Sequence, residues 1–350
     1  MIGAQCITKS YSTLYTIVEM SAHCREHMRV LLTGGSGFIG SHLAEKLLDR
    51  GDWVVSIDNL STGNLGNIVD IMNHDRFTHY TSDLLSREGM DLLRREVRDS
   101  DVIFHLAAAV GVFNVVNFPA ETIKNNIEIT ETLLRYAKES KSKVVIFSTS
   151  EVYGKSDDFP YDEDQDIVLG PSKNSRWSYA ASKLVDEFLG LAYYNQHQLP
   201  VIVVRLFNTV GPRQVGHYGM VVPRFVEQAI SNSPITVFGS GKQSRCFCNV
   251  EDTIEALLGL ISDDNCVGEV FNIGSSQEIS IKDLAIMIKQ ITNSDSEITF
   301  TPYEDAYSSG FEDMLRRVPD TTKINRLIGW ESSIGIEETI RRVWRYIEQE

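Results

Sequence analysis

A chain of 350 residues, with 42% hydrophobic and 23% charged side chains, is typical of a soluble globular protein of one large domain or two that share an interface. Its net charge of −15 argues against a nucleic-acid binder, because no basic face is evident to neutralise phosphates. The sequence contains no run of about 18 apolar residues, which argues against a helix that spans a membrane.

The first 28 residues mix polar and charged groups throughout and do not form a convincing signal peptide. We expect either that Met28 is the natural start or that residues 1–28 are a poorly ordered arm. The cysteines are an odd and sparse set, which favours reduced thiols and a cytoplasmic location. They are Cys6, Cys24, Cys246, Cys248 and Cys266. The spacing of the pair Cys246 and Cys248 is wrong for zinc, so we expect strand residues there and no metal site.

A strand, a glycine-rich turn and a helix are predicted in succession from Arg29. The run after Arg29 is short and apolar, and apolar residues then recur every fourth position as far as Gly51. Gly34, Gly37 and Gly40 lie at the junction. Glycines there permit a tight turn and the close approach of a pyrophosphate to the helix N-terminus. The pattern therefore predicts a dinucleotide-binding loop, with a purely structural unit as the alternative.

A carboxylate ends the second predicted strand, which covers residues 53–57. This residue, Asp58, lies 18 positions after Gly40, where it can accept hydrogen bonds from a ribose and repel a 2′-phosphate. The position favours NAD over NADP. Asp83 follows a polar segment, and it either reaches the adenine edge or caps a helix.

Further apolar strands alternate with helical segments, at 102–106, 144–147 and 201–204. Such alternation predicts an α/β fold, a doubly wound parallel sheet of the Rossmann type. His105 lies within one strand and is interpreted as a packed core residue. In the second half, the tail from residue 324 to 350 alternates apolar and charged residues, which predicts one packed terminal helix.

The segment that follows the strand at 144–147 contains Thr149, Ser150 and Glu151. Ligands of open α/β sheets bind at the carboxyl ends of the strands, so these side chains are candidates for a site, with a simple capping loop as the alternative.

Tyr179 and Lys183 lie four residues apart in a segment predicted to be helical, so their side chains share one face. A phenol has a pKa near 10 and needs a neighbouring cation to serve as a base at neutral pH. Lys183 is placed to supply that charge. An isolated pair of this kind arises often by chance, so the surrounding motifs have to decide.

Taken together, the motifs resemble the extended short-chain dehydrogenase/reductase superfamily of nucleotide-sugar epimerases, dehydratases and decarboxylases. The segments that carry the resemblance, in the family's order, are 33–40, Asp58, 105–108, 148–154, 179–183 and 205–213. The resemblance covers about residues 29–345. It implies a Rossmann domain with bound NAD over 29–207, and over 208–350 mainly a smaller α/β lobe that binds a nucleoside diphosphate sugar and returns some segments to the Rossmann domain. It also implies a homodimer. The cytoplasmic location is expected from the cysteines, and no nucleic-acid or membrane partner is expected from the net charge and the apolar runs.

Within the superfamily the chain looks most like the UDP-glucuronate decarboxylases, through segments 148–154, 170–179 and 241–247. The resemblance implies the catalytic residues Thr149, Glu151, Tyr179 and Lys183. The implied NAD contacts are Gly34, Gly37, Phe38, Ile39, Gly40, Asp58, Asn59, Asp83, Leu84, Leu106, Tyr179 and Lys183. The implied substrate contacts are Asn208, Arg224, Arg245 and Arg317.

The implied chemistry begins with oxidation at the sugar C4, where Tyr179 takes the hydroxyl proton and Thr149 hydrogen-bonds the same oxygen. Decarboxylation of UDP-glucuronate to UDP-xylose or its 4-keto precursor is favoured. Simple 4-epimerases need no carboxylate at the position of Glu151, so its presence argues against them. Ser150 stands where the dehydratases of thymidine-linked sugars carry an aspartate, so the proton donor of those enzymes is missing here. Epimerisation of UDP-glucose or UDP-glucuronate, dehydration and, more remotely, a non-catalytic dinucleotide sensor are the alternatives.

Overall fold

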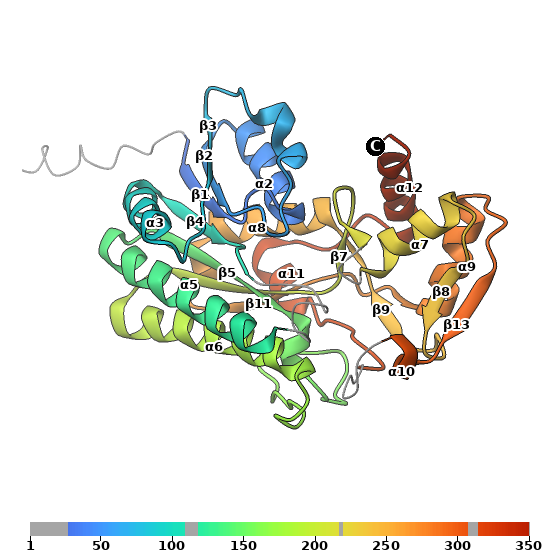
Figure 1. The fold of residues 1–350 in the computed structure, drawn as a ribbon. Helices are drawn as coiled ribbons and strands as arrows, with labels where there is room; N and C mark the ends of the chain where they lie inside the picture. The colour runs from blue at the N-terminus through green and yellow to red at the C-terminus, as the bar shows by residue number, and fades with distance from the viewer. Residues whose placement is uncertain (1–26, 109–117, 217–219, 307–313, 350) are drawn as a thin grey trace, which may run out of the picture.

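The five predicted apolar strands and two that were not predicted, β3 and β11, pair into one seven-stranded parallel sheet in the order β11-β6-β5-β4-β1-β2-β3 (Figure 1). These strands are β1 (Arg29–Thr33), β2 (Trp53–Asp58), β3 (Phe77–Thr81), β4 (Val102–His105), β5 (Lys143–Thr149), β6 (Val201–Leu206) and β11 (Val270–Ile273). The computed structural model describes residues 27–108, 118–216, 220–306 and 314–349, so Cys6, Cys24 and all but the end of the expected arm lie outside them. The α/β prediction is confirmed.

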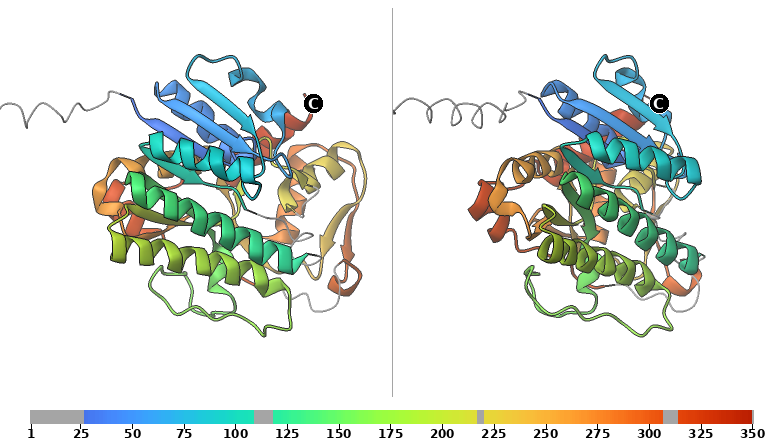
Figure 2. Two further views of the ribbon diagram at one scale, coloured as in Figure 1. Left: turned by 60° about the vertical axis from the view of Figure 1, so that its left-hand side comes forward. Right: turned by 90° about the vertical axis from the view of Figure 1, so that its left-hand side faces the viewer.

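Helices cover both faces of the sheet, because successive side chains of each strand point to opposite faces and both sets are apolar. Val30 and Leu32 pack on one face, against α2 (Phe38–Asp49), α8 (Val250–Ser262) and α11 (Thr322–Ile328). Leu31 packs on the other face, against α3 (Arg87–Asp99), α5 (Pro119–Ser140) and α6 (Arg176–His197). Two views in Figure 2 show α5 and α6 lying side by side along that face. The sheet therefore has a buried apolar core on each side.

A smaller lobe stands beside the carboxyl ends of the strands, at the right of Figure 1. Its strands form three pairs: β7 (Thr209–Val210) with β10 (Cys248–Asn249), β8 (Ile235–Phe238) with β13 (Ile298–Thr301), and β9 (Ser244–Cys246) with β12 (Glu278–Ser280). Its helices are α7 (Val221–Ile230), α9 (Ile281–Ile291), α10 (Tyr303–Ala306) and α12 (Ile336–Ile347). Cys246 and Cys248 are strand residues, as predicted. The lobe has an apolar core of its own, to which α7, α9 and α12 contribute.

The chain crosses between the two parts more than once. It leaves the sheet after β6, returns to pack α8 on the sheet face and to add β11 at the sheet edge, and then continues into β12 and α9 of the lobe. The 3₁₀ segments are η1 (Leu65–Ile71), η2 (Ser150–Tyr153) and η4 (Asp264–Cys266).

The prediction of one terminal helix is wrong, because the tail forms α11 and α12 with a loop between them. Gly329 ends α11 with a φ of 70°, in the left-handed region that glycine adopts readily. Its N–H donates to the carbonyl of Asn325 at 2.7 Å. The following Trp330 is 8% exposed and packs into the core of the sheet, so the chain cannot continue as an exposed helix.

Within the described ranges, every helix is too short or too polar to cross a lipid bilayer.

Candidate functional site

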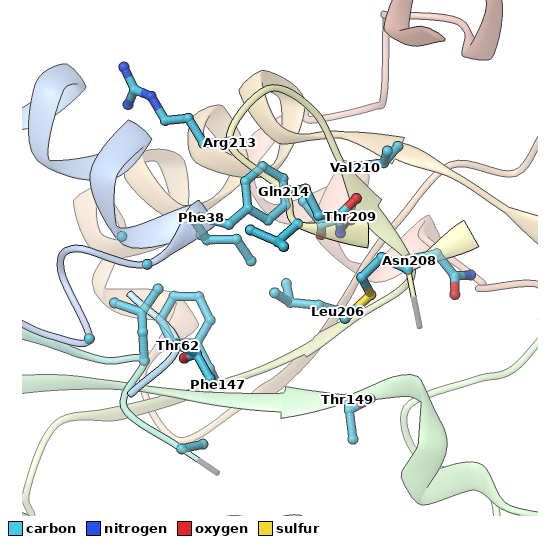
Figure 3. Close-up of a pocket in the computed structure, with 18 of the residues that line it drawn as sticks. Phe38, Thr62, Phe147, Thr149, Leu206, Asn208, Thr209, Val210, Arg213 and Gln214 are labelled. Atoms are coloured by element: carbon cyan, nitrogen blue, oxygen red, sulfur yellow. Dashed lines mark hydrogen bonds between the residues drawn. The ribbon is translucent and has the colours of Figure 1, made fainter. Parts of the chain in front are cut away.

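A cavity of about 960 Å³ lies between the carboxyl ends of the sheet strands and the lobe. The order of the strands reverses at β1, which pairs with both β2 and β4, and ligands of open α/β sheets bind at such a point. All the residues predicted to contact cofactor or substrate, or to act in catalysis, line this one cavity. Figure 3 shows Thr149 at the end of β5, with Leu206 and Asn208 on the neighbouring segment. Their individual roles remain proposals.

The glycine-rich turn between β1 and α2 is shaped for close approach of a ligand. Gly34 has a φ of 75°, and a Cβ added to Gly40 would lie 2.4 Å from the carbonyl oxygen of Gly34. The carboxylate of Asp58 stands beside this turn, accepting the N–H of Ser36 at 2.9 Å and that of Leu60 at 2.8 Å. Three features of this turn fit a dinucleotide: the N-terminus of a helix, glycines that leave the backbone uncovered, and a carboxylate held in place by hydrogen bonds.

The structure gives definite positions to Asp83 and His105, for which the sequence allowed more than one role. Asp83 lines the cavity and accepts the N–H of Leu85 at 2.9 Å, whereas the N-cap of α3 is Ser86. His105 is 1% exposed and lies 2.8 Å from the hydroxyl of Thr33. Burial, with a smaller effect of the Lys183 charge, lowers the pKa of His105 to about 3, so this side chain is a neutral core residue.

The carboxylate of Glu151 is the centre of a cluster of arginines. Both nitrogens at the tip of Arg176 contact it, one of them at 2.9 Å, and Arg317 Nη1 lies 3.4 Å from Oε1. Burial raises the pKa of Glu151, but the charges of Arg176 and Arg317 outweigh burial and lower it to about 2, with a smaller effect of Arg245. Glu151 is therefore an ionised acceptor. Thr149 precedes it and accepts its N–H at 3.3 Å.

Tyr179 and Lys183 both lie on α6 and line the cavity, but Lys183 has another partner. Its Nζ lies 2.8 Å from Oδ2 of Asp186, in a pair that is closed to solvent. Burial raises the pKa of Tyr179 above its usual range, Glu151 and Asp186 raise it further, and Arg176 opposes them. Burial dominates the pKa of Tyr179 in this structure, and the Lys183 ammonium is paired with the Asp186 carboxylate, so the role of Lys183 in favouring the phenolate stays a prediction.

The predicted substrate contacts lie at the lobe side of the cavity. Arg224 donates to the carbonyl of Thr236 at 2.9 Å, and its guanidinium lies 4.3 Å from the ring centroid of Phe238. Arg245 is 7% exposed. Asn208 has a φ of 40° and donates its amide to the carbonyl of Cys246 at 2.9 Å, so it also braces the lobe.

Sequence reasoning missed two residues, Arg176 and Asp186. Arg176 lies three residues before Tyr179 and Asp186 three residues after Lys183, which places each about one helical turn from the predicted pair. Helical spacing was the signal that could have found them. The contact between Arg176 and Glu151 could not be found in this way, because Glu151 lies on another element.

Known proteins are similar in sequence to this chain over almost its whole length. The family model for GDP-mannose 4,6-dehydratase matches residues 31–343. UDP-N-acetyl-alpha-D-glucosaminuronate decarboxylase of Bacillus cytotoxicus is 41% identical, over 89% of this chain and 97% of that protein. UDP-glucuronic acid decarboxylase 1 of Xenopus tropicalis is 34% identical, over 99% of this chain and 78% of that protein.

A solved structure agrees with these relatives. The UDP-glucuronic acid 4-epimerase of Bacillus cereus, in complex with UDP-glucuronic acid and NAD, superimposes with a TM-score of 0.83 at 29% identity, covering 92% of this chain and 99% of that one. The resemblance inferred from the motifs is thereby confirmed. This chain belongs to the GDP-mannose 4,6-dehydratase family, within the extended short-chain dehydrogenase/reductase superfamily of NAD-dependent nucleotide-sugar enzymes.

Proposed function

We propose that this protein is an NAD-dependent lyase that oxidises C4 of a UDP-linked hexuronic acid and releases its C6 carboxylate as CO2. UDP-glucuronate would give UDP-xylose or its 4-keto precursor. The observation that carries the proposal is the arginine cluster. Arg176, Arg317 and Arg245 all lower the pKa of one carboxylate, Glu151, and all three line the cavity between the sheet and the lobe. Such a site suits a substrate that brings a carboxylate and a pyrophosphate.

The chain's own residues account for the proton transfers. Tyr179 must be a phenolate in the reacting complex, and the positive charge of a bound nicotinamide, together with Lys183, would favour that form. The phenolate accepts the proton of the C4 hydroxyl, and Thr149 donates a hydrogen bond to the same oxygen as its negative charge develops. Bound NAD would supply the acceptor for the C4 hydride and return it later. The resulting ketone at C4 is β to the C6 carboxylate. The C5–C6 bond then breaks, CO2 leaves, and the electron pair is held as an enolate until C5 takes a proton from water. When the hydride returns to C4, Tyr179 gives its proton back to the C4 oxygen.

Two features favour decarboxylation over the other fates of the ketone. Dehydration needs an acid to expel the C6 hydroxyl, but Glu151 is held ionised and the adjacent residue is Ser150, which carries no acid. Epimerisation needs the 4-keto sugar to present its other face to the hydride. A C6 carboxylate bound by Arg317 or Arg245 would hinder that rotation.

A second candidate substrate differs only at C2. The Bacillus cytotoxicus relative, which is 41% identical, is named for the N-acetylated sugar, whereas the Xenopus tropicalis relative at 34% is named for the glucuronic acid. The two substrates share the C4 hydroxyl and the C6 carboxylate. The same residues would therefore act on both.

The test is incubation of the purified protein and NAD with UDP-glucuronate, UDP-N-acetylglucosaminuronate and UDP-glucose in separate reactions, followed by NMR of the sugar and measurement of CO2. A UDP-pentose formed with one equivalent of CO2 is the expected result, and the first two reactions rank the substrates. UDP-galacturonate or UDP-galactose would replace the proposal with epimerisation. A 4-keto-6-deoxy sugar would replace it with dehydration.

The cytoplasmic homodimer is part of the same proposal. Apolar side chains stand exposed on the two outer helices, with Phe188 66% and Val185 38% exposed on α6 and Ile123 37% exposed on α5. Burial of these side chains against a second copy would remove apolar surface from water. Light scattering should give the mass of a dimer for the wild type and of a monomer for Phe188→Glu. A monomeric wild type would contradict the assembly without touching the proposed reaction.

A further inference from the structure

Helix α6 carries a third ionisable side chain in line with the tyrosine and lysine. Residues 179, 183 and 186 follow the i, i+4, i+7 spacing of one helical face. The Lys183 ammonium lies 2.8 Å from Oδ2 of Asp186, and the two side chains are 3% and 0% exposed. Lys183 is thus held by a carboxylate that is closed to solvent.

This pair is not explained by stability. Two buried charges lose their hydration, and replacing such a pair by apolar residues is often neutral or stabilising. The other carboxylate oxygen, Oδ1 of Asp186, is buried and accepts no hydrogen bond from any residue in the described part of the chain. An unsatisfied buried acceptor is costly, so its presence here needs an explanation other than stability.

The neighbouring acid cannot replace Asp186, because it is already engaged. Glu187 pairs with Arg205, with Oε2 and Nη2 2.8 Å apart, and accepts a hydrogen bond from Ser148. That pair joins α6 to β6 and β5. Asp186 is therefore the carboxylate on α6 that holds Lys183.

We propose that Asp186 is a positioning residue of the tyrosine-lysine pair: its carboxylate holds the Lys183 ammonium at the wall of the cavity and offsets that ammonium's charge at Tyr179. This inference takes from the proposed function only that Tyr179 is the base. It does not depend on which sugar is bound or on what becomes of the ketone.

The charges around Tyr179 determine the expected direction of the effect. Glu151 on η2 and Asp186 on α6 raise its pKa, Arg176 on α6 lowers it, and burial raises it most of all. His105 of β4 is close enough to Lys183 for the ammonium to lower the pKa of its imidazole, and it is neutral. Removing the charge of Asp186 removes one of the two anions, so the pKa of Tyr179 falls. The acid limb of a reaction that needs the phenolate then moves to lower pH.

The experiment compares Asp186→Asn with a matched control, Asp264→Asn. Asp264 also pairs with a lysine, Lys143, at 2.9 Å, but its side chain is 95% exposed and it lies by the start of β5, the end opposite to Thr149. The pH profile of kcat/KM is measured on the NAD-loaded enzymes. Ultraviolet absorbance then follows phenolate formation in each protein without substrate, with Tyr179→Phe as the background.

For Asp186→Asn we expect an acid limb at lower pH than in the wild type, by more than any difference between the wild type and Asp264→Asn. The phenolate signal of Tyr179 should also appear at lower pH. Asp186→Glu, which keeps the charge, should restore the wild-type profile, and this variant also serves if Asp186→Asn fails to fold. Coincident profiles and titrations for wild type and Asp186→Asn would overturn the inference.

A double-mutant cycle separates positioning from a structural role. If Asp186 acts through Lys183, then Asp186→Asn should change kcat/KM much less in a Lys183→Met background than in the wild type. Equal effects in both backgrounds would overturn the inference. A shifted tyrosine titration in a protein that releases no CO2 would sink the proposed function and leave this inference standing.

Discussion

Replacing Arg176 by methionine should destabilise the folded protein by about 3 kcal/mol, because it leaves the Glu151 carboxylate buried without its main cation. On folding, burial raises the pKa of Glu151 and the arginines lower it, from the usual 4.5 to about 2. At about 1.4 kcal/mol per pKa unit, that difference of about 2.5 corresponds to about 3 kcal/mol for the three arginines together, less the cost of burial. Removal of one partner of a buried ion pair generally costs about 3–5 kcal/mol, which agrees with the value expected for Arg176→Met. The Glu151 side chain is only 15% exposed, so solvent screening removes little of it.

The sign of this contribution fixes its dependence on pH. The folded-state pKa lies below the unfolded-state value, so the stabilisation is complete above pH 4.5 and is lost as the pH falls towards about 2. At pH 7 the whole contribution is present. The comparison of variants should therefore be made there.

The assay is urea unfolding at pH 7 of four proteins: wild type, Arg176→Met, Glu151→Gln and the double variant. We expect the double variant to be more stable than Arg176→Met, because removal of the second charge relieves the first loss, with a coupling free energy of about 3 kcal/mol. As a control, Lys46→Met breaks an exposed ion pair with Glu255 and should cost about 1 kcal/mol or less. A double variant whose loss is the sum of the single losses would refute the reasoning.

Three further predictions concern the cavity. Tyr179→Phe should lower kcat by about 10²-fold or more with NAD still bound, whereas the control Tyr193→Phe on the same helix should stay active. NMR of the product measures the activity of both variants, and an active Tyr179→Phe would contradict the mechanism. Asp58→Ala should weaken the binding of NAD and reduce the ratio of NAD affinity to NADP affinity, both measured by calorimetric titration. An unchanged ratio of the two affinities would exclude the assigned contact between Asp58 and the ribose. The imidazole of His105 should show no NMR titration between about pH 5 and 8, because its pKa is about 3, and a midpoint near neutrality would refute its burial in the core.

Most of the sheet could be predicted from the sequence because its strands are buried on both faces and read as continuous apolar runs. Strand β3 could not. Its five residues, from Phe77 to Thr81, include a histidine and two threonines, and only Phe77 is fully buried, because β3 lies at the edge of the sheet. An edge strand with one covered side has neither the apolar run nor a clean alternation.

The site also contains residues that could be predicted from the sequence and contacts that could not. Residues in local motifs, such as Gly40 and Thr149, could be predicted because their placement depends on a turn or a strand end. The contact between Glu151 and Arg176 joins residues 25 positions apart on two elements, and no periodicity encodes it. The partner of Lys183 was also missed, because the tyrosine-lysine motif directs attention to residue 179, whereas the Lys183 ammonium lies 2.8 Å from the buried carboxylate of Asp186.

The repeated crossing of the chain between sheet and lobe limits how such a protein can be recombined. The segment that forms α8 and β11 is bounded on both sides by lobe strands, so a single crossover after β6 would exchange part of the main sheet along with the lobe. A chimera intended to change sugar preference would need separate grafts on either side of β11. Lobes of this kind are not interchangeable cassettes. Divergence among relatives of this fold is therefore expected to proceed by substitutions in the cavity wall, at positions such as Ser150 and Arg317.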